Sequence, residues 1–107
     1  MRLMTKAIEK KIPKLYAQDG KGESAIVYVK FFLPGTRWTW YVTEFDGKDT
    51  FFGYVISGID PSFDEWGYAS LKELEMLTLI KSYELKVERD LYFEPKTLRE
   101  VLVEEKL

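Results

Sequence analysis

The sequence predicts an α+β fold: a small antiparallel β-meander sheet packed on one face by two or three short helices. Three successive runs rich in β-branched and aromatic residues, separated by short turn sequences, predict the sheet. Apolar residues at helical spacing near both ends of the chain predict the helices. At 107 residues, the chain is long enough to bury one core, so residues 1–107 are expected to form a single domain.

The chain begins with a predicted helix, a loop and a strand. Residues 5–11 place apolar side chains at helical spacing, with Thr5 as the cap and Pro13 beyond the end. Residues 18–24 combine two glycines with an Asp, which is typical of a turn-rich loop. Residues 26–32 are dense in β-branched and aromatic residues and predict the first strand.

Two further strands are predicted in the middle of the chain. Residues 38–46 and 50–57 flank a short turn in which Gly47 suits a positive φ, so they are expected to form a hairpin. Because side chains alternate along a strand, the first of these strands has Trp38, Trp40 and Val42 on one face and Thr39, Tyr41, Thr43 and Phe45 on the other.

A loop, a brief strand and a helix are expected next. Residues 58–67 are rich in Gly, Asp and Pro and indicate the loop, and residues 68–69 are expected to form a brief fourth strand. Ser70 and Glu73 match a capping box, in which each side chain satisfies a free backbone donor at a helix start. The helix is therefore expected over residues 71–77.

The remaining elements are an extended segment, a strand and a last helix. Residues 79–87 are expected to be extended, and residues 88–93 to form a strand that ends before Pro95. Residues 96–105 predict a helix, because helical spacing relates Leu98, Val101 and Leu102.

Composition narrows the chemistry. The chain contains no Cys and no His, which excludes disulfides, thiol nucleophiles, zinc fingers and Ser-His-Asp catalysis. We therefore expect no cofactor, except Mg²⁺ or Mn²⁺ if a carboxylate site exists. Asn is absent and Gln occurs once, beside twelve Glu and twelve Lys, a bias typical of thermophile proteins.

The charge is divided unevenly along the sequence. The net charge is −2, with +5 over residues 1–37 and −7 over residues 38–107. The overall balance disfavours binding through phosphates, whereas a basic N-terminal third favours an acidic or phosphate-bearing partner. No apolar run has the length of a membrane span, and the first residues lack a signal peptide's apolar stretch, so we expect a cytoplasmic protein with no membrane partner.

Several segments together resemble a known protein family. They are Ala25–Phe32, the string from Trp38-Thr39-Trp40-Tyr41 to Gly47, Phe51-Phe52-Gly53, Gly67–Leu71 with Glu73-Leu74, and Glu88–Phe93. The sequence resembles a bacterial family of short proteins, often carried on plasmids, phages and integrated elements, that is catalogued only as a domain of unknown function (family 2958). The resemblance implies a fold shared along the chain and a mobile-element setting, and it implies no activity.

Acidic residues provide one candidate site. Glu44 and Asp46 share a strand face, as do Glu88 and Asp90, and pairing of the two strands would bring four carboxylates together. Four such oxygens would suit Mg²⁺ or Mn²⁺ and a phosphoesterase or nuclease reaction. In the simpler interpretation, Asp46 serves the turn and Glu44 pairs with Arg89.

Aromatic residues provide the other candidate. Seventeen aromatic residues exceed what a core of this size comfortably holds. Trp38 and Trp40 are expected either to stack bases on an exposed face or, the favoured interpretation, to lie in the core under the helices, with Tyr41 and Phe45 then facing outward. Phe63 and Trp66 belong to an acidic loop that is a candidate recognition segment.

Three functions remain open from the sequence. The favoured one is a non-catalytic macromolecular interaction module with a protein partner, using the candidate surface Trp38, Trp40, Tyr41, Phe45, Phe63 and Trp66. The second is a carboxylate-metal phosphoesterase or nuclease built on Glu44, Asp46, Glu88 and Asp90. The third is a nucleic-acid binder that uses the basic N-terminal third with the Trp and Tyr residues of the sheet face.

Overall fold

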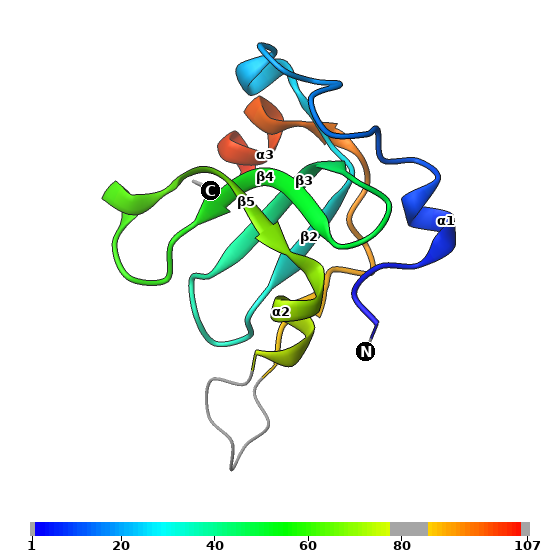
Figure 1. The fold of residues 1–107 in the computed structure, drawn as a ribbon. Helices are drawn as coiled ribbons and strands as arrows, with labels where there is room; N and C mark the ends of the chain where they lie inside the picture. The colour runs from blue at the N-terminus through cyan, green and yellow to red at the C-terminus, as the bar shows by residue number, and fades with distance from the viewer. Residues whose placement is uncertain (1, 78–85, 106–107) are drawn as a thin grey trace.

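A five-stranded antiparallel sheet forms the centre of the molecule (Figure 1). The computed structural model describes residues 2–77 and 86–105. The strand order in the sheet is β5-β4-β3-β2-β6, and β1 and β7 form a separate pair. The strands are β1 (Ile26–Val27), β2 (Val29–Phe32), β3 (Thr39–Phe45), β4 (Thr50–Ile56), β5 (Glu65–Ser70), β6 (Glu88–Arg89) and β7 (Lys96–Thr97).

The α+β class and the antiparallel meander are confirmed, because β2, β3, β4 and β5 are adjacent in the sheet in chain order. The first predicted strand is divided at Tyr28, whose N–H donates to the Val42 carbonyl at 2.9 Å. Before this point β1 pairs with β7, and after it β2 pairs with β3 and β6. One continuous run of strand residues therefore contributes to two sheets.

A β-bulge interrupts β3 between Val42 and Glu44. An extra residue in one strand shifts the alternation of side chains by one position. The prediction that Phe45 lies on the face of Tyr41 is therefore wrong: Phe45 joins Trp40 and Val42 in one buried cluster, and Tyr41 belongs to another. The bulge also leaves both Thr43 and Glu44 buried.

Helices cover both faces of the sheet rather than one. They are α1 (Lys6–Glu9), α2 (Leu71–Met76) and α3 (Leu98–Glu105), with short 3₁₀ turns η1 (Gly22–Ser24) and η2 (Pro61–Phe63). Leu71 and Leu74 of α2 pack in the cluster that contains Phe31 and Trp40. Leu98 and Val101 of α3 pack with Tyr41 in the other cluster. The seven-residue strand β3 is buried along its length, because both of its faces are covered.

Several element ends differ from the sequence expectations. Thr5 caps α1 as predicted, accepting a hydrogen bond from the Ile8 N–H. The brief strand expected at residues 68–69 extends from Glu65 to Ser70 and replaces part of the predicted loop. The strand expected over residues 88–93 ends at Arg89. Most of the segment 79–87 lies outside the described residues.

At the end of β5, the capping position is confirmed. The Ser70 hydroxyl accepts a hydrogen bond from the Glu73 N–H at 3.2 Å, so α2 begins where the motif predicted. The carboxylate that completes the cap comes from Asp49, which accepts from the Lys72 N–H at 2.7 Å. Among the helices of the described residues, none has the length and apolar character needed to cross a membrane.

Candidate functional site

Four aromatic rings gather on one face of β4 and β5. Phe52 and Tyr54 come from β4, and their register partners Tyr68 and Trp66 come from β5. Phe52 and Trp66 stack nearly parallel, with ring centroids 5.4 Å apart and an interplanar angle of 7°. Tyr68 lies 4.8 Å from Phe52, and Tyr54 meets Trp66 edge to face at 5.6 Å. We call Phe52, Tyr54, Trp66 and Tyr68 the aromatic surface.

This aromatic surface reaches solvent at the margin of the sheet. β5 is the last strand in the sheet order, and among the described residues no strand pairs with its outer edge. The Tyr68 side chain is 55% exposed, and the other three rings are partly exposed. Aromatic side chains that remain accessible beside an open strand edge provide both apolar contact area and free backbone groups.

A cavity of about 390 Å³ lies between the aromatic surface and the loop 18–25. Its lining includes Gln18, Asp19, Thr43, Glu44, Phe52 and Trp66. Gln18 fixes the loop in place, because its side-chain amide donates to the carbonyls of Ile26 and Thr43, both at 2.9 Å. Its Oε1 accepts from the Ile26 N–H at 2.7 Å.

The buried carboxylate of Glu44 forms the inner part of this cavity. Its side chain is held by two backbone donors: the Tyr16 N–H at 2.7 Å and the Gln18 N–H at 2.9 Å. Tyr16 has a φ of 73°, in the left-handed region that non-glycine residues rarely adopt. Glu44 therefore helps to hold Tyr16 in this strained conformation at the entrance to the loop. Separately, the Tyr16 hydroxyl raises the pKa of Tyr68 through a side-chain hydrogen bond.

A second cavity of about 410 Å³ borders β5 and the loop 57–64. Its lining includes Trp38, Val55, Ile59, Phe63, Trp66 and Tyr68. Trp38 is partly buried and packs so closely against Gly58 that a Cβ there would meet its ring at 2.1 Å. Phe63 is 60% exposed and Ile59 is 78% exposed.

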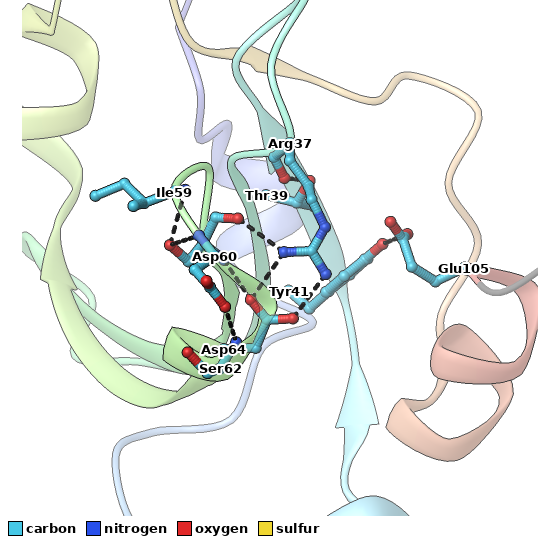
Figure 2. A network of polar contacts seen from close by, with 9 residues as sticks. Arg37, Thr39, Tyr41, Ile59, Asp60, Ser62, Asp64 and Glu105 are labelled. Carbon is cyan, nitrogen blue, oxygen red and sulfur yellow. Dashed lines mark hydrogen bonds and ion pairs between the residues drawn. The ribbon is translucent and has the colours of Figure 1, made fainter.

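An ion pair holds the loop that carries Phe63 (Figure 2). Two nitrogens of the Arg37 guanidinium donate to the two carboxylate oxygens of Asp64, at 3.1 and 2.8 Å. Arg37 also donates to the Ser57 carbonyl at 2.8 Å, and the Ser57 N–H donates to Asp64 at 2.7 Å. The hydrogen bond from Arg37 lowers the pKa of Asp64. These contacts join the two ends of the loop, Ser57 and Asp64, to each other and to Arg37.

Tyr41 and Glu105 meet beside the same ion pair (Figure 2). The Tyr41 hydroxyl donates to the Glu105 carboxylate at 2.7 Å, which ties β3 to the end of α3. Burial raises the pKa of Tyr41, and the hydrogen bond to Glu105 raises it further. A third hollow lies here, and both of its arginines already have acidic partners: Arg37 pairs with Asp64, and Arg99 pairs with Glu23. Glu105 also lines this hollow.

Only part of the predicted binding surface is accessible. Trp40 is 7% exposed, which agrees with the favoured interpretation of a Trp stripe in the core. The expectation that Tyr41 and Phe45 face outward is wrong, because α3 covers Tyr41 and the bulge turns Phe45 into the opposite cluster. Phe63 and Trp66 remain accessible and line the second cavity.

The four carboxylates of the predicted metal site do not come together. The strands expected to pair are separated, because β2 lies between β3 and β6. Asp46 accepts from three N–H groups in the β3–β4 turn, as the simpler interpretation predicts. Asp90 accepts from the Tyr92 N–H in a turn of its own. Among the described residues, no group of three or more acidic side chains could hold a metal ion.

The alternative pairing of Glu44 with Arg89 is also wrong for the same topological reason. Arg89 lies on β6 and donates to the backbone carbonyls of Arg2 and Leu3, both at 2.9 Å. It therefore holds the N-terminal segment against the edge of the sheet. Glu44 instead lies at the cavity described above.

Sequence reasoning missed Gln18, Phe52, Tyr54 and Tyr68 as site residues. Phe52 and Tyr54 alternate on one strand, a signal that the sequence already contained. Tyr68 and Trp66 share the same spacing, but the predicted loop concealed the strand that aligns them with β4. Gln18 is the single glutamine of the chain, yet its sequence position gives no sign that it is buried.

The comparisons with known proteins give one match. No curated protein and no solved structure matches the chain. A family model described as "Protein of unknown function (DUF2958)" matches residues 3–104. This match includes β3, β4 and β5 and the loop that bears Gln18. Because it spans nearly the whole chain, the protein belongs to the DUF2958 family of proteins of unknown function.

Proposed function

We propose that this chain is a non-catalytic interaction module that binds a partner protein across the aromatic surface. The observation that carries the proposal is the set of four contacting rings on β4 and β5, beside a strand edge that no described strand covers. An extended segment of a partner can add to such an edge through backbone hydrogen bonds. Its side chains would then pack on the rings.

The charges around the aromatic surface support a protein partner over a nucleic acid. Asp19 and Glu44 line the neighbouring cavity, and Glu65 lies on the edge strand itself. Phosphates bind where Lys and Arg gather, and carboxylates repel them. Trp40, proposed as part of a base-stacking platform, lies in the core. The setting proposed with this function is a cytoplasmic protein of a thermophile, carried on a mobile element.

Two exposed tyrosines provide a matched test. The immobilised chain would be incubated with lysate from its native type of host, half of it nuclease-treated, and the captured protein would be purified and titrated. Tyr68→Ala removes a ring of the aromatic surface, whereas Tyr92→Ala removes a 92% exposed ring beyond β6, at the opposite sheet edge. We expect Tyr68→Ala to weaken binding at least tenfold and Tyr92→Ala to leave it within twofold.

The outcomes are distinct. Nuclease-resistant capture that depends on Tyr68 supports the module. Capture that nuclease abolishes, or a purified partner that binds Tyr68→Ala as tightly as the wild type, contradicts it. Circular dichroism of both variants confirms that each remains folded.

A further inference from the structure

The cavity beneath loop 18–25 contains a negative charge that no described cation balances. Glu44 is 3% exposed, and its two oxygens accept hydrogen bonds from neutral backbone donors. The ion pairs among the described residues involve other acids: Asp64, Glu104 and Glu23. A buried carboxylate is stabilised by hydrogen bonds and by a nearby cation, and among the described residues Glu44 has the hydrogen bonds but no cation. An external cation would therefore gain the attraction of Glu44.

The other walls of the cavity also suit a cation. Phe52 and Trp66 both line it, and aromatic rings attract positive charge. Asp19 adds a second carboxylate, and no Lys or Arg occurs among the described residues that line the cavity. The volume of about 390 Å³ falls within the range of small-ligand sites, roughly 300–1,000 Å³. The charge, the aromatic lining and the volume of the cavity all favour a ligand with a cationic group.

The backbone around the cavity is already arranged for binding. Tyr16 is held at a φ of 73° by its hydrogen bond to Glu44, and Gln18 fixes the next turn through three side-chain bonds. Such strained, over-determined backbone occurs where a site is held in advance of its ligand. The carboxylate therefore does not need to reorganise to receive a cation.

We propose that this cavity binds the cationic head of a Lys or Arg side chain that the partner protein presents. The inference rests on the proposed function, because the cavity shares Phe52 and Trp66 with the aromatic surface. A strand added along β5 would place alternate side chains on that face, beside the cavity. The partner segment would then carry a basic residue among apolar ones.

Capped amino acids test the inference without the partner. Nα-acetyl-arginine amide and Nα-acetyl-lysine amide would be titrated into the ¹⁵N-labelled chain, with the uncharged Nα-acetyl-norleucine amide as the matched probe. We expect saturable shifts of the Trp66 indole and of the amides of Gly20 and Gly22, which also line the cavity, with the cationic probes. Norleucine should bind at least tenfold more weakly. Putrescine forms a separate arm that represents a free amine.

Variants identify the charge that matters. Glu44→Gln keeps the side-chain size and should weaken binding of the cationic probes at least tenfold. If it does not fold, Asp19→Asn and Trp66→Leu replace it, with the glycine amides as the signal. Glu88→Gln removes the same charge from β6, at the opposite sheet edge, and should change binding less than twofold.

Each outcome decides the inference. It is overturned if the cationic probes give no saturable shift, if norleucine binds equally well, or if the cavity variants bind the cations like the wild type. Binding of putrescine alone overturns the assignment to a partner side chain. Binding of capped Arg or Lys upholds the cavity even where partner capture fails, so this inference and the interaction module fail separately.

Discussion

Gln18 shows how one buried amide can organise a loop. Its three side-chain hydrogen bonds connect loop 18–25 to β1 and β3, at 2.7–2.9 Å. Gln18→Ala leaves the Ile26 N–H and two carbonyls without these partners, and we expect a loss of roughly 2–4 kcal/mol in the free energy of unfolding. Urea denaturation measures it, with the exposed Lys21→Ala as control. A loss no larger than that of the control would contradict the role of Gln18.

The buried hydroxyl of Tyr41 should make the stability of the folded chain depend on pH in the alkaline range. Burial raises the pKa of Tyr41 in the folded chain, whereas an unfolded Tyr ionises near pH 10. Its stabilisation is therefore complete below about pH 10 and is lost as the pH rises above that value. At pH 7, Tyr41→Phe loses the bond to Glu105 and should be less stable by about 1 kcal/mol.

The stability difference between Tyr41→Phe and the wild type should shrink above pH 10. The wild type loses the contribution of Tyr41 there and the variant has none to lose, so their denaturation midpoints should converge. Urea unfolding at pH 7, 9.5 and 11 measures this. A difference in denaturation midpoint that stays the same at all three pH values would contradict the assignment of this effect to ionisation of Tyr41.

Side-chain direction was predictable from the sequence only up to the bulge in β3. Alternation correctly separates Trp40 and Val42 from Tyr41. Beyond Val42 the extra residue reverses the pattern and buries Phe45 in the opposite cluster. Nothing in the residues themselves marks the bulge, because Thr and Glu also fit a regular strand.

Two glycines in register across β4 and β5 behave differently. Gly53 and Gly67 are partners, but a Cβ on Gly53 would lie 2.0 Å from the Tyr41 carbonyl oxygen, whereas a Cβ on Gly67 would meet no atom of the described part of the chain within 4 Å. We expect Gly53→Ala to cost at least about 3 kcal/mol and Gly67→Ala to stay within about 1 kcal/mol. Thermal unfolding of the two variants measures their losses of stability relative to the wild type. Equal losses would contradict the role of the close approach between Gly53 and the Tyr41 carbonyl.

Elements with strong local signals were predictable, and those that depend on distant partners were not. The β3–β4 hairpin and the Ser70 cap follow from Gly47 and from the Ser-x-x-Glu spacing. β5 contains only two residues with a clear strand signal, and it extends to six because β4 provides a ladder. Pairing energy overrides local preference in such edge strands.

At the scale of the whole molecule, the class of fold was predictable and the candidate site was only partly so. The sequence indicated surplus aromatics, and two members of the predicted candidate surface reach solvent: Phe63 is exposed and Trp66 is partly exposed. The cavity around Glu44 depends on loop 18–25 crossing residues more than twenty positions away, through contacts such as that from Gln18 to Thr43. Contacts at this sequence separation leave no periodic signal.

Four aspartates stabilise turns throughout the molecule, and they predict its acid sensitivity. Backbone N–H groups lower the pKa of Asp46 and Asp60, the Ser70 hydroxyl lowers that of Asp49, and Arg37 lowers that of Asp64. A carboxyl with a lowered pKa stabilises the fold above about pH 4, and that contribution is lost as the pH falls through its folded pKa. Stability should therefore fall as the pH drops below about 4.

Single Asn variants should distinguish these carboxylates from a general effect of acid. Asp46→Asn and Asp64→Asn should be less stable than the wild type at pH 7, because each removes a charged acceptor. Their denaturation midpoints should approach that of the wild type as the pH falls below 4 and the native aspartates become protonated. Urea unfolding at pH 7, 4 and 2.5 measures the approach. A gap of equal size at all three pH values would show that geometry, rather than charge, makes these turns stable.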